Sequence, residues 1–263
     1  MGSRVTARLL LASAWLVAWT GTAVELVSAR TLGNPQGIAR WLPADVLVGP
    51  APTALMGLLG VVGCVLLVRS RRPLGPALLL FAVLYVQAQV EVSLYMGTAR
   101  IGHGKFLPGV AMGVAALGWG STWLGRSREE AERLALELAC GVAAALYFSA
   151  GMVKLWTSGL HWAQNLNLSL LVYERSFLVD GTWRAVRVHL AEAPTLLSGL
   201  GALALTVELA SVLFLFPRLR FAYACLVTAM HLGLGVCLGY WYVEWVLAMW
   251  ALVVWTAAGG EDA

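Results

Sequence analysis

The chain has 263 residues, of which 60% are hydrophobic and 12% are charged, whereas an ordinary soluble domain has about 45–50% and about 25%. This composition excludes a water-soluble globule, because so few polar side chains cannot cover its surface, and a mean hydropathy of +0.77 favours lipid as the solvent. The net charge of +4 does not indicate nucleic-acid binding, because the arginines lie at the ends of apolar runs and do not form a basic patch in the sequence.

Apolar runs separated by Arg, Pro and Gly predict an all-α, polytopic transmembrane bundle that forms a single integral membrane domain over residues 1–263. About eight spans are predicted, at residues 8–29, 46–68, 74–97, 107–124, 134–156, 194–216, 219–239 and 240–258. The flanks of the first run also fit a cleaved signal peptide, but its length and Glu25 favour a retained helix. The fourth span is short and glycine-rich from Gly109 to Gly120, which predicts a tightly packed internal helix.

One long connection, from about Trp156 to Ala193, separates the fifth and sixth spans. Apolar residues recur in it at helical spacing, at Leu166, Leu170, Tyr173 and Phe177. This pattern predicts an amphipathic helix in the outer membrane interface, where it could roof a cavity. The dense clusters Arg69–Arg72 and Arg126–Arg133 lie in short loops and predict the cytoplasmic side. Both termini are therefore expected in the cytoplasm.

Polar side chains inside the predicted spans need a partner or a function, because each ionisable group there costs about 2.5–3.5 kcal/mol. Counting along the spans places seven of them in the outer half of the membrane: Glu25, Gln87, Gln89, Glu91, Lys154, His231 and Glu244. The same counting places Glu137 and Glu208 in the inner half. This distribution predicts a polar cavity that opens outward.

Lys154 is one of only two lysines among 18 basic residues, the other being Lys105. Tyr147, Gly151 and Lys154 share one face of the fifth span, and the glycine lets another helix or a flat ligand approach closely. Several alternatives remain open. Lys154 could snorkel to the headgroups, Glu91 could be a structural ion-pair partner, and His231 could be an ordinary buried group bonded to Thr228 or a neighbouring span. The histidines lack a metal-binding spacing, so no metal is predicted.

The segment from Tyr147 to Leu155, YFSAGMVKL, resembles the Y-F-x-A-G-x-x-K-L motif of the vitamin K-dependent gamma-carboxylase family and its short bacterial relatives, the HTTM membrane proteins. Trp156, Gly159 and Trp162 follow this motif, and Gly102–Leu107 resembles the segment in which the carboxylases carry an Asn-His pair. Glu208 and His231 stand where these proteins commonly place a Glu and a His. The resemblance implies a bacterial inner-membrane protein that handles a vitamin K-like quinone or hydroquinone.

The resemblance also implies roles for individual residues. Lys154 matches the base that deprotonates the hydroquinone in the carboxylases, and His103 would orient or stabilise the quinol oxygen. The proposed catalytic pair is thus Lys154 and His103. The residues assigned to substrate binding combine positions of the family pattern with Glu91 from the polar layer of the spans, and they are Glu91, Tyr147, Gly151, Trp156, His231 and Glu208. A lysine in a desolvated site can give up its proton near neutral pH, whereas an arginine cannot.

Departures from the family pattern limit what the resemblance implies. The first of the carboxylases' two adjacent lysines is Val153 here, and the Asn of their Asn-His pair is Gly102. The large lumenal portion that helps the carboxylases bind protein substrates has no counterpart in the 263 residues. The expected activity is therefore a quinol-dependent oxygenase-like or carboxylase-like reaction without peptide carboxylation. The alternative is a non-catalytic membrane anchor, or a quinone- or lipid-binding subunit for a protein redox partner.

Overall fold

The computed structural model describes residues 3–28, 44–94, 103–163 and 166–260. Within these ranges the regular structure is helical, and no strand occurs. Four helical segments are long and apolar enough to cross a membrane, at Pro50–Arg69, Arg128–Trp162, Pro194–Leu215 and Arg220–Leu238. Two shorter apolar helices cover Leu74–Val90 and Val243–Ala258. These segments indicate an integral membrane protein, and the all-α prediction is confirmed.

Each of the predicted spans overlaps a helix in the structure, and the predicted span ends at residues 29 and 95–97 lie outside the described residues. The helices are α1 (Ser3–Ser28), α2 (Ala44–Leu47), α3 (Pro50–Arg69), α4 (Leu74–Leu94), α5 (His103–Gly120), α6 (Arg128–Ser158), α7 (Leu166–Ser176), α8 (Gly181–Ala191), α9 (Pro194–Leu209), α10 (Arg220–Leu238) and α11 (Val243–Gly260). Short 3₁₀ turns follow α5, α6 and α9. The amphipathic helix expected near Leu166–Phe177 is α7, whereas α8 was not predicted.

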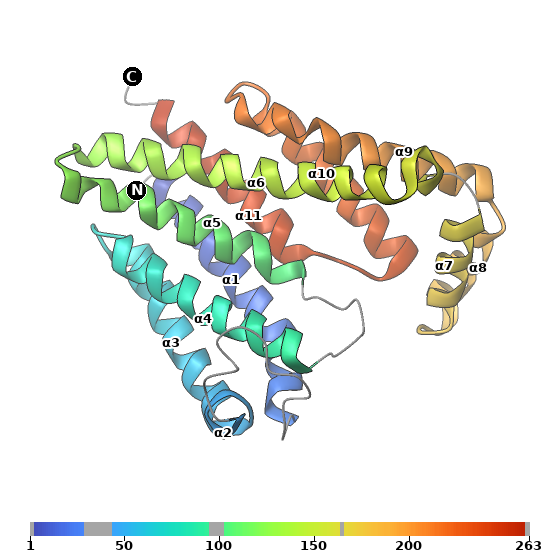
Figure 1. The fold of residues 1–263 in the computed structure, drawn as a ribbon, viewed down its shortest axis with the longest axis horizontal. Helices are drawn as coiled ribbons and strands as arrows, with labels where there is room; N and C mark the ends of the chain where they lie inside the picture. Colours follow the sequence, from blue (N-terminus) through green and yellow to red (C-terminus); the bar gives the residue numbers. More distant parts are fainter. Residues whose placement is uncertain (1–2, 29–43, 95–102, 164–165, 261–263) are drawn as a thin grey trace. The chain divides into compact units, whose positions relative to one another are not determined.

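The helices group into two compact units, Met1–Val142 with Val243–Ala263 (the first unit) and Ala143–Tyr242 (the second unit). In the first unit, α1 lies against α3 and α11 (Figure 1). The packing of α1 on α3 depends on glycine, because a Cβ atom at Gly60 would come within 1.7 Å of the Trp15 ring. The Trp15 indole is fully buried and donates a hydrogen bond to the Leu80 carbonyl in α4.

The glycine-rich helix α5 packs as closely as its sequence predicts. A Cβ atom at Gly118 would lie 2.3 Å from the Ala135 backbone in α6, and one at Gly113 would lie 2.7 Å from the Phe81 ring in α4. Only a residue without a side chain allows helices to approach to this distance. The expected close packing is therefore present at Gly113 and Gly118, whereas Leu117 on the same helix is largely exposed.

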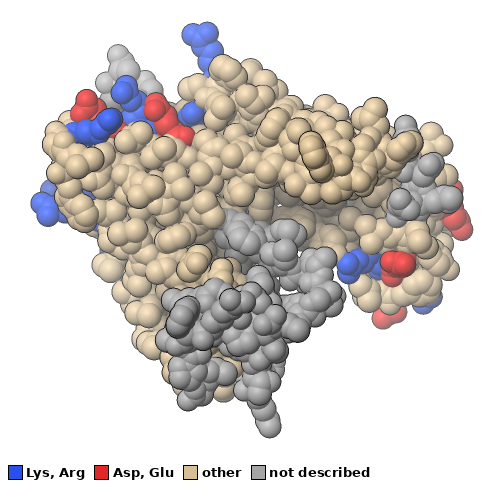
Figure 2. Space-filling view, viewed as in Figure 1, with Lys and Arg blue, Asp and Glu red and all other residues tan. Residues whose placement is uncertain are grey.

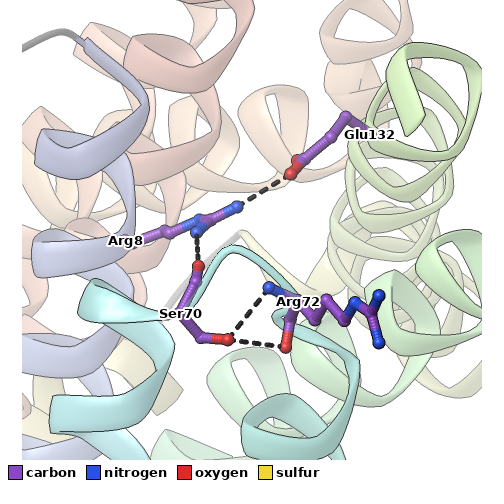
Figure 3. Close-up of polar contacts among 4 residues, drawn as sticks. All are labelled: Arg8, Ser70, Arg72 and Glu132. Atoms are coloured by element: carbon purple, nitrogen blue, oxygen red, sulfur yellow. Dashed lines mark hydrogen bonds and ion pairs between the residues drawn. The ribbon is translucent and has the colours of Figure 1, made fainter.

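One end of the first unit is held by a buried ion pair. The Arg8 guanidinium in α1 donates to Glu132 Oε1 in α6, at 2.7 Å, and to the Ser70 carbonyl between α3 and α4, at 2.8 Å (Figure 3). A capping box starts α6 nearby, because Ser127 and Glu130 exchange hydrogen bonds between side chain and backbone. Helices α1 and α6 therefore begin, and α3 ends, at the same end of this unit.

The second unit contains the later part of α6, the pair α7 and α8, and helices α9 and α10. Arg187 of α8 is buried and donates to the Val236 carbonyl near the end of α10, at 3.1 Å, and to the Arg175 carbonyl in the last turn of α7, at 2.9 Å. A guanidinium stabilises carbonyl groups that a helix end leaves unpaired. This single side chain joins three helices.

Candidate functional site

A face of α6 carries polar side chains within the second unit. Tyr147, Gly151 and Lys154 follow one another at steps of four and three residues, so they share one side of the helix. Tyr147 and Gly151 are buried, and Lys154 is partly exposed. The stripe expected from the sequence faces the interior of the unit, where α9 and α10 supply its partners.

Lys154 has two partners in this unit. Its ammonium group donates a hydrogen bond to Glu208 Oε1 of α9 and forms an ion pair with it. Lys154 Nζ also lies 4.7 Å from the centre of the Trp162 ring, which is a cation–π distance. The side chain is 27% exposed. Lys154 is thus held against protein groups, which favours a site over simple snorkelling to the headgroups.

Gly151 allows α9 to approach α6 at this point. A Cβ atom there would lie 3.1 Å from Glu208 Cβ and 3.0 Å from the Leu209 side chain. Both distances are tighter than ordinary van der Waals contact, so a larger residue would push α9 away. Gly151 therefore sets the approach of Glu208 to Lys154.

Glu208 has one oxygen in the ion pair and one that is buried without a hydrogen bond. The Glu208 side chain is 8% exposed, and Oε2 has no partner among the residues that the structure describes. A buried carboxylate oxygen normally accepts a hydrogen bond, because leaving it unsatisfied costs about 1–3 kcal/mol or more. This oxygen can accept a hydrogen bond from a hydroxyl group brought in by a ligand.

A second polar pair lies one to two turns away along α6. The Tyr147 hydroxyl and His231 Nε2 of α10 share a hydrogen bond of 2.7 Å, and both residues are buried. The Tyr147 ring also meets the Tyr223 ring edge to face, with centroids 6.4 Å apart. Tyr223 in turn donates to the Val207 carbonyl, at 3.0 Å, beside Glu208 in the chain. The two pairs are therefore linked through Tyr223 and α9.

The structure corrects one prediction about depth. Counting along the spans assigned Lys154 and Glu208 to opposite halves of the membrane, yet the two side chains are in direct contact. A helical side chain leans toward the N-terminus of its helix, so the long Lys154 side chain reaches back along α6. Counting by Cα position ignores this reach. The charged ends of Lys154 and Glu208 therefore lie at the same depth.

The remaining predicted site residues are not all brought together. Trp156 is 88% exposed, and Trp162 is the tryptophan that covers Lys154. His103 and Glu91 lie in α5 and α4, but their side chains fall outside the described residues. Among the described residues, the group that the structure brings together is Tyr147, Gly151, Lys154, Glu208 and His231, with Trp162 beside Lys154.

Sequence reasoning missed two tyrosines that contact this group. Tyr223 precedes His231 by eight residues, a spacing that places both on one helix face, and this signal was available in the sequence. The Tyr242 ring lies 5.1 Å from the His231 ring, centroid to centroid, and its backbone has a positive φ of 35°. Such a conformation is uncommon for a residue other than glycine, so no local sequence pattern would have indicated it.

Within the described residues, no group of three or more His, Cys, Asp or Glu side chains could hold a metal ion. No protein-family model, curated protein or solved structure matches the chain.

Proposed function

We propose that the second unit is the proton-accepting site of a membrane quinol-handling enzyme. The observation that carries this proposal is the Lys154–Glu208 pair, in which Glu208 Oε2 is buried without a partner among the described residues. A quinol hydroxyl can donate the hydrogen bond that Glu208 Oε2 lacks among the described residues. A quinol dissolves in lipid, so it can reach a site in a membrane protein from the bilayer. The buried aromatic rings of Tyr147 and Tyr223 supply apolar surface for a flat ring.

The proposed step moves one proton. In the proposed step the Lys154–Glu208 pair starts as the amine of Lys154 and the carboxylic acid of Glu208, which is neutral overall. It accepts the proton of a quinol hydroxyl and becomes ammonium and carboxylic acid, with a charge of +1. The quinol becomes a quinolate with a charge of −1, which the positive pair stabilises at close range. Trp162 shields the ammonium group from solvent on one side.

The Tyr147–His231 pair is proposed to orient the second quinol oxygen. Both groups can donate or accept, so the pair can adapt to a quinol or to the quinone that its oxidation leaves. By the family resemblance, the quinolate then reacts with dioxygen, and His103 would help to orient or stabilise the quinol oxygen. These roles stay predictions, as does the assignment to the HTTM and gamma-carboxylase family.

The membrane arrangement is part of the same proposal. We infer about eight spans, with both termini in the cytoplasm of a bacterial-type inner membrane and α7 lying in the outer interface. Two ring contacts fit an interfacial place for α7, because Tyr173 packs edge to face on Phe177 and Arg175 stacks over Tyr240. Amphipathic aromatic and arginine side chains are typical of that layer.

The test uses the purified full-length protein with a short-chain naphthoquinol, whose oxidation by dioxygen is followed by absorbance. We expect Lys154→Met to lower turnover by about 10²–10⁴-fold, the usual range for loss of an acid–base group. Lys154→Arg should also fail, since a guanidinium does not release its proton. Arg184→Gln, which removes an exposed cation elsewhere in the second unit, should leave turnover unchanged.

Two outcomes would contradict the proposal. Retained turnover in Lys154→Arg would overturn the role of the lysine in accepting a proton. A wild-type protein that carries an extractable quinone, identified by mass spectrometry, yet oxidises no quinol would support a binding subunit for a redox partner instead. Co-purification of such a partner in stoichiometric amount would then identify it.

A further inference from the structure

We propose that the end of the first unit where α6 begins is a binding surface for the headgroup of an anionic phospholipid. Two short turns present exposed arginines at this end, the α3–α4 turn and the α5–α6 turn. The arginines are Arg69, Arg71, Arg72, Arg126 and Arg128. Figure 2 shows blue side chains gathered at this end with some red ones among them, whereas the visible helix faces beside it carry little charge.

The Arg8–Glu132 pair fixes the two turns beside each other. One guanidinium bonds both Ser70, in the first turn, and Glu132, four residues after Arg128. Ser70 also closes its own turn, because its hydroxyl accepts from the Arg72 N–H and donates to the Arg72 carbonyl, each at 2.9 Å (Figure 3). The Arg72 guanidinium extends away from this network. The buried pair therefore leaves the outer arginines free to bind.

Most carboxylates at this end already have partners. Glu132 pairs with Arg8, Glu137 lies 3.8 Å from Arg133, and Glu130 accepts hydrogen bonds from Ser127. Glu129 is the exposed carboxylate left over among the described residues of this turn. No ion pair within the described part of the chain involves the five outer arginines. The surface therefore has an excess of positive charge that an anion can neutralise.

Exposed apolar side chains border the arginines, and they distinguish a lipid from a free anion. Trp123 and Leu124, just before Arg126, are 81% and 85% exposed. A tryptophan and a leucine beside arginines form the usual interfacial pattern, in which the apolar groups meet the glycerol and acyl region and the cations meet the headgroup. Guanidinium groups bind phosphate oxygens in a bidentate manner. The preferred ligand is thus an amphiphile with a phosphate headgroup.

The test is a lipid titration of the full-length protein in a non-ionic detergent, read by native mass spectrometry. The two probes are phosphatidylglycerol and phosphatidylcholine with the same acyl chains. The variant Arg71→Gln/Arg126→Gln removes one arginine from each turn. Its matched control, Arg184→Gln/Arg218→Gln, removes two exposed arginines of the second unit. Thermal unfolding in detergent verifies that each variant is folded.

We expect the wild type and the control to prefer phosphatidylglycerol. The surface variant should bind it at least about fivefold more weakly, because each arginine near the membrane surface contributes about 1 kcal/mol to the binding of an anionic lipid. Binding of phosphatidylcholine should not change. Equal affinity of the wild type for both lipids would overturn the proposal, as would equal losses in the two double variants. Displacement of the lipid by millimolar inorganic phosphate would also overturn it, because the surface would then bind free phosphate.

Discussion

Two ion pairs of similar form lie in the two units of the molecule. In the first unit, Arg8 pairs with Glu132, and in the second, Lys154 pairs with Glu208. Each carboxylate uses one oxygen for the cation and has a second oxygen, Oε2, buried without a partner among the described residues. The carboxylates are equally enclosed, with side-chain exposures of 7% and 8%. The pairs differ in the cation and in what surrounds it.

The difference separates a structural pair from one suited to chemistry. Arg8 cannot release its proton. Its second hydrogen bond goes to the Ser70 carbonyl, so the side chain joins α1, the α3–α4 turn and α6. A lysine is a residue type that can take part in proton transfer, and Lys154 has an aromatic face, Trp162, as its other partner. A chain with 16 arginines and two lysines thus places one lysine where proton transfer is proposed.

The largest effect on stability should come from breaking the pair in the first unit. Arg8→Met keeps an apolar side chain of similar length but leaves Glu132 without its cation. We expect the free energy of unfolding to fall by about 3–5 kcal/mol, because the lost partner leaves an uncompensated buried charge. Thermal unfolding in detergent measures this effect. An Arg8→Met variant as stable as the wild type would show that this pair does not hold the unit.

The packing of α1 on α3 should be nearly as sensitive. Gly60→Ala places a Cβ atom 1.7 Å from the buried Trp15 ring, and the ring is stacked on Trp19, with centroids 6.3 Å apart. We expect a loss of about 1–3 kcal/mol from overpacking. The control is Gly141→Ala in α6, which meets nothing within 4 Å and should stabilise the helix by about 0.5–1 kcal/mol. Equal melting temperatures of the two variants would refute the close approach at Gly60.

A conservative exchange sharpens the comparison between the two cations. Arg8→Lys retains a positive charge beside Glu132 but cannot easily reach the Ser70 carbonyl as well. We expect a loss of about 1.5 kcal/mol, the value of one hydrogen bond from a charged group, with quinol oxidation unchanged. The same measurements on Lys154→Arg should give the opposite result, a folded protein without turnover. A loss of turnover in both variants would mean that the two pairs do not differ in role.

The sequence predicted the helices well because apolar runs of this length have few alternatives in lipid. It also predicted the face of α6 with Tyr147, Gly151 and Lys154, since helical spacing alone places them together. It did not predict that Glu208 contacts Lys154, because the reach of a long side chain is invisible to residue counting. The exposure of Trp156 and the use of Trp162 depend on the 3₁₀ turn Gly159–Trp162, which periodicity does not resolve.

The smallest expected effect concerns the Tyr147–His231 pair. Tyr147→Phe removes one hydroxyl group and leaves the aromatic packing on Tyr223 intact. We expect a loss of about 1 kcal/mol in unfolding free energy, the usual contribution of a buried hydrogen bond, together with a weaker apparent affinity for the naphthoquinol. The control Tyr85→Phe removes a hydroxyl from a half-exposed tyrosine of the first unit and should change neither quantity. If Tyr147→Phe lowers stability but leaves the affinity for the quinol unaltered, the Tyr147–His231 pair stabilises the fold, as Arg8–Glu132 does. The Lys154–Glu208 pair alone would then bind the quinol.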